Sequence, residues 1–138
     1  MKSVLILYMS RGGHTARVAR RLCDSIAAAG GRAEMMDLVE AAHEGVDWPR
    51  FDVVALGAPV LYGKYDVSVM DFITRHRAEL EARPNSFFNV SVVARTPEKS
   101  TVSGNRYMQK FLQLSPWRPH DLKVIAGKVD YPAWPWLD

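Results

Sequence analysis

The chain contains 138 residues, of which 48% are hydrophobic and 24% charged, and it carries a formal net charge of +3 at pH 7. This composition is typical of one soluble globular domain over residues 1–138; it excludes intrinsic disorder and does not indicate a nucleic-acid-binding protein. The single cysteine, Cys23, excludes an internal disulfide, and the apolar runs are too short to span a membrane, so we expect a cytoplasmic protein.

The first half of the chain predicts three strands and one long helix. Residues 3–8 form a short, continuous apolar run, which predicts a buried parallel strand. Apolar residues then recur at helical spacing over residues 15–28, until two glycines end the pattern. Residues 33–38 predict a second strand, residues 39–50 permit at most a short helix, and residues 53–58 predict a third buried strand.

The second half continues this alternation. Helical spacing recurs over residues 69–80 and again around Phe111, while residues 86–94 and 123–129 predict the fourth and fifth strands. Strands that alternate with helices predict an α/β domain whose doubly wound parallel sheet has helices on both faces. Two prolines within residues 130–138 exclude a regular helix there, so the usual last helix of such a domain is predicted to be missing.

The turn between the first strand and the first helix is the first candidate site. Its residues are Ser10, Arg11, Gly12, Gly13, His14 and Thr15. Backbone N–H groups at a helix start attract an anion, glycines permit close approach, and hydroxyl groups donate to phosphate oxygens. The spacing fits neither a nucleoside-triphosphate loop nor a dinucleotide fingerprint, which leaves a site for one phosphate. The alternative is a tight turn without a ligand, and a Thr15 side chain facing the interior would favour it.

Two further loops follow the third and fourth strands, at the edge where doubly wound sheets bind ligands. An aromatic residue in the first loop can stack on a flavin ring, and the second loop is long and basic. The residues that we assign to the flavin are Pro59, Val60, Leu61, Tyr62 and Gly63 in the first loop, and Ala94, Arg95 and Thr96 in the second. The alternatives are that Tyr62 and Tyr65 only pack against the domain, and that the second loop is simply solvated.

Four segments carry a resemblance to a known family. They are residues 62–65, 93–99, 117–119 and 124–127, and together they resemble the menaquinone-dependent protoporphyrinogen IX dehydrogenases, flavodoxin-like enzymes of haem biosynthesis. The resemblance extends from Met1 to about residue 136 and implies a flavodoxin-like sheet with strand order 2-1-3-4-5. That family continues for several dozen residues beyond this point, which implies that the present chain is short at its C-terminus.

The resemblance also implies a reaction. FMN would remove electrons from protoporphyrinogen IX to give protoporphyrin IX and pass them to a quinone, so the flavin carries the chemistry and no catalytic acid, base or metal is expected. The porphyrinogen carries propionate groups, for which basic residues near the loops are candidates. These candidate substrate-binding residues are Lys64, Arg95, Lys99 and Arg106.

The tail and the sheet edge suggest possible partners. Tyr131, Trp134 and Trp136 favour peripheral contact with the inner face of the cell membrane, where the quinone resides, although packing within the domain or in a homo-oligomer is equally compatible. Three rival functions stay open at this stage. They are a flavodoxin that only carries electrons, an NAD(P)H:quinone reductase, and a degenerate flavodoxin-like domain that serves interactions.

Overall fold

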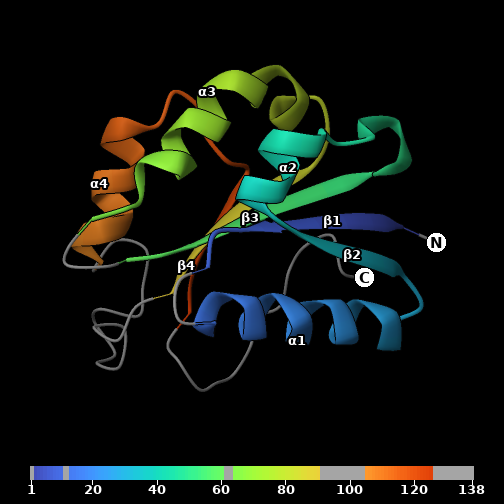
Figure 1. Cartoon of the computed structure of the whole chain (residues 1–138). Helices are drawn as coiled ribbons and strands as arrows, with labels where there is room; N and C mark the ends of the chain where they lie inside the picture. Colours follow the sequence, from blue (N-terminus) through green and yellow to red (C-terminus); the bar gives the residue numbers. More distant parts are fainter. Residues whose placement is uncertain (1, 11–12, 61–63, 91–104, 126–138) are drawn as a thin grey trace.

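The structure is a computed structural model that describes residues 2–10, 13–60, 64–90 and 105–125. The elements in chain order are β1 (Ser3–Tyr8), α1 (His14–Ala28), β2 (Arg32–Asp37), α2 (Leu38–Glu44), the 3-10 helix η1 (Trp48–Arg50), β3 (Val53–Pro59), α3 (Val67–Glu81), β4 (Asn85–Val90), α4 (Arg106–Leu114) and β5 (Asp121–Ile125). The strands form one parallel sheet in the order β2-β1-β3-β4-β5 (Figure 1), which confirms the predicted topology.

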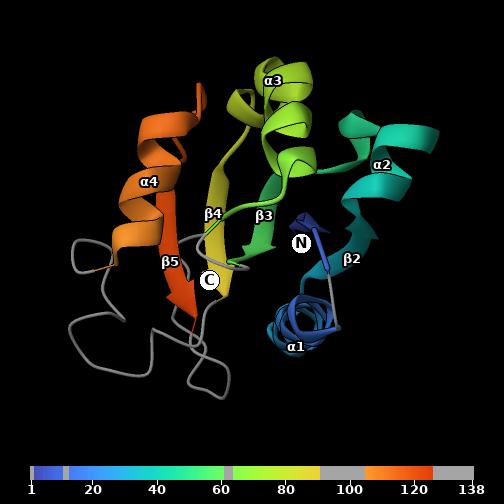
Figure 2. The same ribbon diagram turned by 60° about the vertical axis from the view of Figure 1, so that its left-hand side comes forward.

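The described helices cover both faces of the sheet, as the alternation of elements predicted. Helix α1 packs on one face, while α2, α3 and α4 lie side by side on the other (Figures 1 and 2). Strand β1 serves both layers because successive side chains of a strand point to opposite faces. Val4 and Ile6 pack with α1, whereas Leu5 and Leu7 pack with α2 and α3.

Most predicted elements appear within one or two residues of their expected bounds. Strand β1 has the predicted bounds, and α2 with η1 fills the segment expected to hold at most a short helix. Strand β5 begins two residues early because Asp121 pairs in register with Ser86 of β4. The predicted ends of the fourth and fifth strands, at 91–94 and 126–129, lie outside the described residues, as does the predicted absence of a last helix.

The parallel arrangement brings the carboxyl ends of β1, β3 and β4 to one edge. Two backbone hydrogen bonds hold this edge together where the strands end. Met9 N–H donates to the Gly57 carbonyl over 3.0 Å, and Val60 N–H donates to the Val90 carbonyl over 3.1 Å. The three segments in which we predicted a ligand therefore leave the sheet at the same edge.

Candidate functional site

No side chain among the described residues caps the start of α1. Gly13 is the N-cap residue, with a φ of +80° that favours glycine, and the first turn of α1 contains no acidic residue. The first backbone N–H groups of a helix lack partners within the helix and carry partial positive charge. The first turn of α1 is thus open to an external anion.

The other described α-helices differ at the same position. Asp37, Asp66 and Asn105 precede α2, α3 and α4, and each side chain accepts a hydrogen bond from a first-turn backbone N–H over 2.8–3.1 Å. Such caps typically contribute about 1 kcal/mol. Among the described residues, α1 alone starts without this contribution from its own chain.

Thr15 provides a second, independent observation at this turn. Its side chain is fully buried, and its Oγ1 has no hydrogen-bond partner among the described residues. A buried hydroxyl without a partner costs about 1–3 kcal/mol. The burial agrees with the packing alternative considered for this turn, but packing alone leaves the hydroxyl unsatisfied. A phosphate oxygen as acceptor would satisfy it, so the residues present fit a phosphate group.

The remaining residues of the turn lie close to this point. Ser10 and His14 are partly buried, with His14 the first residue of α1, and Gly13 is exposed. Arg11 and Gly12 lie outside the described residues. The described part of the turn therefore offers helical N–H groups and the unpartnered Thr15 hydroxyl to an anion.

The structure describes only the beginning of each of the other two loops. Pro59 is buried and Val60 half-buried at the carboxyl end of β3, beside the end of β4. The other predicted residues of these loops fall outside the described residues: Leu61, Tyr62, Gly63, Ala94, Arg95, Thr96 and Lys99. Their assignment to flavin or substrate stays a prediction.

Two of the predicted substrate-binding residues are described, and both are exposed. Lys64 directly precedes Tyr65, and Arg106 directly precedes Tyr107. The Tyr65 hydroxyl donates to the Tyr107 carbonyl over 2.9 Å, which brings the segments of the two cations together. The guanidinium of Arg106 lies 4.9 Å from the centroid of the Tyr107 ring and donates to its hydroxyl. Neither cation forms an ion pair within the described part of the chain.

Sequence reasoning missed a polar cluster beneath this edge. Tyr65, Asn89 and Asn105 are joined by hydrogen bonds, and the two asparagines are buried. The packing alternative for Tyr65 is correct, because its ring meets Phe87 and Phe111 edge-on. One signal was available in the sequence: within the predicted fourth strand, Asn89 stands between the apolar residues Phe88 and Val90, where a buried polar group needs a partner.

Comparison with known proteins now adds to this geometry. Residues 5–138 match the Flavodoxin domain family. Over 134 residues the chain is 37% identical to protoporphyrinogen IX dehydrogenase (quinone) of Escherichia coli, a match that covers 97% of this chain and 73% of that protein.

The chain belongs to the protoporphyrinogen IX dehydrogenase (quinone) family. The resemblance found in the sequence is confirmed, and so is the prediction of an oxidoreductase. A protein of the same name from Leishmania major is 32% identical over 139 residues, which cover 97% of this chain and 58% of that protein.

Solved structures agree with this family in fold. Two-electron reduced Megasphaera elsdenii flavodoxin superposes with a TM-score of 0.61 at 19% identity, covering 92% of this chain and 88% of that one. Oxidised Flavodoxin 1 from Bacillus cereus gives a TM-score of 0.55 at 15% identity, covering 93% and 86%. The flavodoxin-like fold is confirmed, and membership of a flavodoxin domain family implies FMN.

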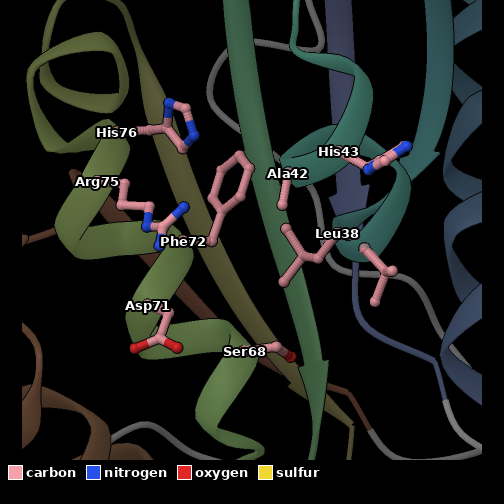
Figure 3. Close-up of a pocket in the computed structure, with 9 residues that line it drawn as sticks. Leu38, Ala42, His43, Ser68, Asp71, Phe72, Arg75 and His76 are labelled. Atoms are coloured by element: carbon pink, nitrogen blue, oxygen red, sulfur yellow. The ribbon is translucent and has the colours of Figure 1, made fainter.

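Other features of the described residues are relevant to the predicted site. They contain no group of three or more His, Cys, Asp or Glu side chains that could hold a metal, and no helix among them is long and apolar enough to cross a membrane. A cavity of about 350 Å³ lies between α2 and α3, lined by Phe72, Arg75 and His76 among others (Figure 3). None of the predicted site residues lines this cavity.

Proposed function

We propose that this chain is an FMN-dependent dehydrogenase that oxidises protoporphyrinogen IX to protoporphyrin IX and passes the electrons to a quinone. The observation that carries the proposal is the 37% identity, across 97% of the chain, to a protein named for this activity. The uncapped start of α1 and the unpartnered Thr15 hydroxyl support it independently, because both suit a phosphate.

The chain's own residues would bind and orient the groups that react. The first-turn N–H groups of α1, with the Ser10 and Thr15 hydroxyls, would hold the FMN phosphate, with Arg11, Gly12, Gly13 and His14 completing the turn. The segments 59–63 and 94–96 would frame the flavin ring. When bound, FMN supplies the two-electron redox chemistry, and we assign no acid or base residue to the chain.

The basic residues around the loops would select the substrate. Lys64 and Arg106 lie on two segments that meet at one hydrogen bond, and neither has a carboxylate partner among the described residues. We assign them, with Arg95 and Lys99, to the propionate groups of the porphyrinogen. A charge-assisted contact of this kind contributes about 1.5–3 kcal/mol.

A membrane quinone as electron acceptor requires the protein to reach the membrane surface. We propose that the protein works in the cytoplasm and touches the inner face of the cell membrane through the aromatic residues Tyr131, Trp134 and Trp136, where a membrane quinone is accessible. We also propose that residues 1–138 form one FMN-binding domain and that this domain self-associates. We propose no nucleic-acid partner for it.

A single substitution tests the phosphate site. Thr15→Val keeps the shape of the side chain but replaces the hydroxyl by a methyl group. FMN should bind about 10- to 100-fold more weakly, the equivalent of one hydrogen bond to a charged acceptor. The protein without FMN should be equally or more stable, because a buried unsatisfied hydroxyl has been removed. Flavin fluorescence titration and thermal unfolding measure the two quantities.

Thr15→Ser is the matched control because it keeps the hydroxyl and should keep FMN affinity. Equal FMN affinity of Thr15→Val and the parent protein would remove Thr15 from the site. A loss of both affinity and stability would instead identify Thr15 as a packing residue.

The reaction itself is tested by mixing the FMN-loaded protein with protoporphyrinogen IX without oxygen. Loss of the oxidised flavin absorbance, and its return on adding menaquinone, is the expected result. Reduction by NADH but not by the porphyrinogen would identify an NAD(P)H:quinone reductase instead. Slow reduction by both would indicate an electron carrier, and failure to bind FMN would contradict the proposal altogether.

A further inference from the structure

A buried hydrogen-bond network lies where the carboxyl end of β4 meets the start of α4. The Tyr65 hydroxyl donates to the carbonyl oxygen of Tyr107 over 2.9 Å and accepts from Asn89 Nδ2 over 3.1 Å. Asn89 Nδ2 also lies 3.3 Å from Oδ1 of Asn105, the N-cap residue of α4. Asn89 and Asn105 are 0% and 1% exposed. The chain after β3, the end of β4 and the start of α4 thus share one network.

The ring of Tyr65 is held separately from its hydroxyl. It meets Phe87 of β4 and Phe111 of α4 edge-on, with 5.9 Å between ring centroids in each pair. Phe87 and Phe111 stack on each other at 3.7 Å. A phenylalanine at position 65 would keep these ring contacts and lose only the two hydrogen bonds. The contribution of the hydroxyl can therefore be separated from that of packing.

The network has a defined place relative to the two predicted flavin loops. Tyr65 follows residues 59–63 of the first loop after one intervening residue, Lys64. Asn89 stands just before residues 91–104, and Asn105 directly after them. The bond from Tyr65 to Tyr107 therefore joins the end of the first loop to the end of the second. That bond therefore constrains the spacing between these two ends.

We infer that Tyr65 is a positioning residue for the flavin ring, because its hydroxyl ties the loop after β3 to the start of α4. The inference rests on the proposed function and deepens it. Tyr65 acts through the two loops. The phosphate turn belongs to a separate segment, at the start of α1 on the other face of the sheet (Figures 1 and 2). The network should therefore govern binding of the ring and leave binding of the phosphate unchanged.

The protonation state of Tyr65 supports this role. Burial raises the pKa of its hydroxyl well above the ordinary value of a tyrosine, and the hydrogen bond from Asn89 opposes only part of that effect. The hydroxyl consequently keeps its proton and remains a donor to the Tyr107 carbonyl throughout the neutral and mildly alkaline range.

The test compares Tyr65→Phe with Tyr107→Phe in the full chain. The second variant is the matched control, because it removes a hydroxyl outside the network and keeps the carbonyl to which Tyr65 donates. Each variant is titrated with FMN and with riboflavin, which has the ring but no phosphate. Tyr65→Phe should weaken both ligands by the same factor, about three- to thirty-fold for one or two hydrogen bonds, and should change the visible circular dichroism of the bound flavin.

The comparison with Thr15→Val sharpens this result, since that variant should weaken FMN but not riboflavin. Unchanged riboflavin affinity and dichroism in Tyr65→Phe, with only a lower melting temperature, would overturn the inference and leave the hydroxyl a structural group. If the parent protein binds neither flavin, the proposed function fails instead.

Amide hydrogen exchange tests the tie itself without any flavin. In Tyr65→Phe, amide exchange should become faster both in residues 64–66 and in residues 105–108. In Tyr107→Phe, exchange should stay unchanged in both segments. Acceleration confined to one segment would overturn the inference. Should Tyr65→Phe fail to fold, Asn89→Ser, which removes the amide donor to Tyr65, is measured in its place with the same expected pattern.

Discussion

The two faces of the sheet are packed with different kinds of side chain. The layer under α1 is largely aliphatic, and Phe88 is its single aromatic residue among the buried members of that cluster. The layer under α2, α3 and α4 contains Trp48, Phe72, Phe87, Phe111 and Trp117.

The hydrogen bonds of buried polar groups also differ between the two faces. Asn85 accepts hydrogen bonds from Trp117 Nε1 and His120 N–H on the aromatic face, where Asn89 also bonds to Tyr65. On the α1 face, the buried Thr15 hydroxyl has no partner within the described residues. The aromatic layer therefore joins several of its buried polar groups by hydrogen bonds, although Asn89 Oδ1 and Ser68 Oγ lack a partner among the described residues. The aliphatic layer ends at a turn whose buried hydroxyl would accept an external partner.

The largest expected effect is the loss of stability when one large buried side chain in each layer is replaced by alanine. Phe111→Ala removes the stacking partner of Phe87 and the edge contacts of Tyr65 and Trp117, and should lower the free energy of unfolding by about 3–5 kcal/mol. Leu22→Ala on the α1 face should cost about 2–4 kcal/mol. Urea unfolding measures both variants. A larger loss for Leu22→Ala would contradict the view that the aromatic layer is the more stabilising of the two.

The next effect concerns one methyl group on the α1 face. A Cβ built on Gly57 would lie 2.1 Å from Cζ of Phe88, its register partner in β4. Gly57→Ala should therefore destabilise the protein by about 1–3 kcal/mol through overpacking. Adding Phe88→Leu should recover part of this loss because the smaller side chain leaves room. Strictly additive losses in the double variant would show that the ring is not the obstacle.

The smallest expected effect is a pH dependence of stability that arises from His76 on the aromatic face. His76 lies against Phe72 and Trp48 at a non-helical position inside α3. Burial lowers the pKa of His76; the guanidinium of Arg75 adds to this shift, and Glu79 opposes it.

Because the folded-state pKa lies below the unfolded value of about 6.5, the unfolded chain binds the proton more readily. The associated stability is fully present above pH 6.5 and is lost as the pH falls from there through the folded pKa. Urea unfolding between pH 5 and pH 8 should give a shallower slope for His76→Gln than for the parent protein. His43→Gln, across the cavity, should keep the His76-dependent part of the slope, and an unchanged slope in His76→Gln would refute this assignment.

The sequence predicted the fold well wherever one periodic pattern settled an element. The apolar run at residues 3–8 predicted β1 because a strand buried on both faces has no polar side to show. The alternation of elements sufficed for the parallel sheet, whereas its strand order followed from the family resemblance.

The candidate site was predictable only in part. A phosphate turn was expected from the position of its glycines, but the burial of Thr15 depends on packing that no local pattern encodes. The network around Tyr65 was missed because its members are up to 42 positions apart in sequence and meet only after β4 and α4 have packed. The kink of α3 at His76 could not be predicted because no proline or glycine lies in that helix.

The missing side-chain cap of α1 has a consequence for how fast the protein is degraded before it binds a cofactor. Without an anion, the first turn of this helix lacks a partner that the other described α-helices take from their own chain, so it should fray more readily. A cofactor bound there would act as the absent cap and would stabilise the folded state by mass action. The supply of flavin would then set how much of the newly made chain escapes proteolysis, so that cofactor availability governs protein abundance as well as activity.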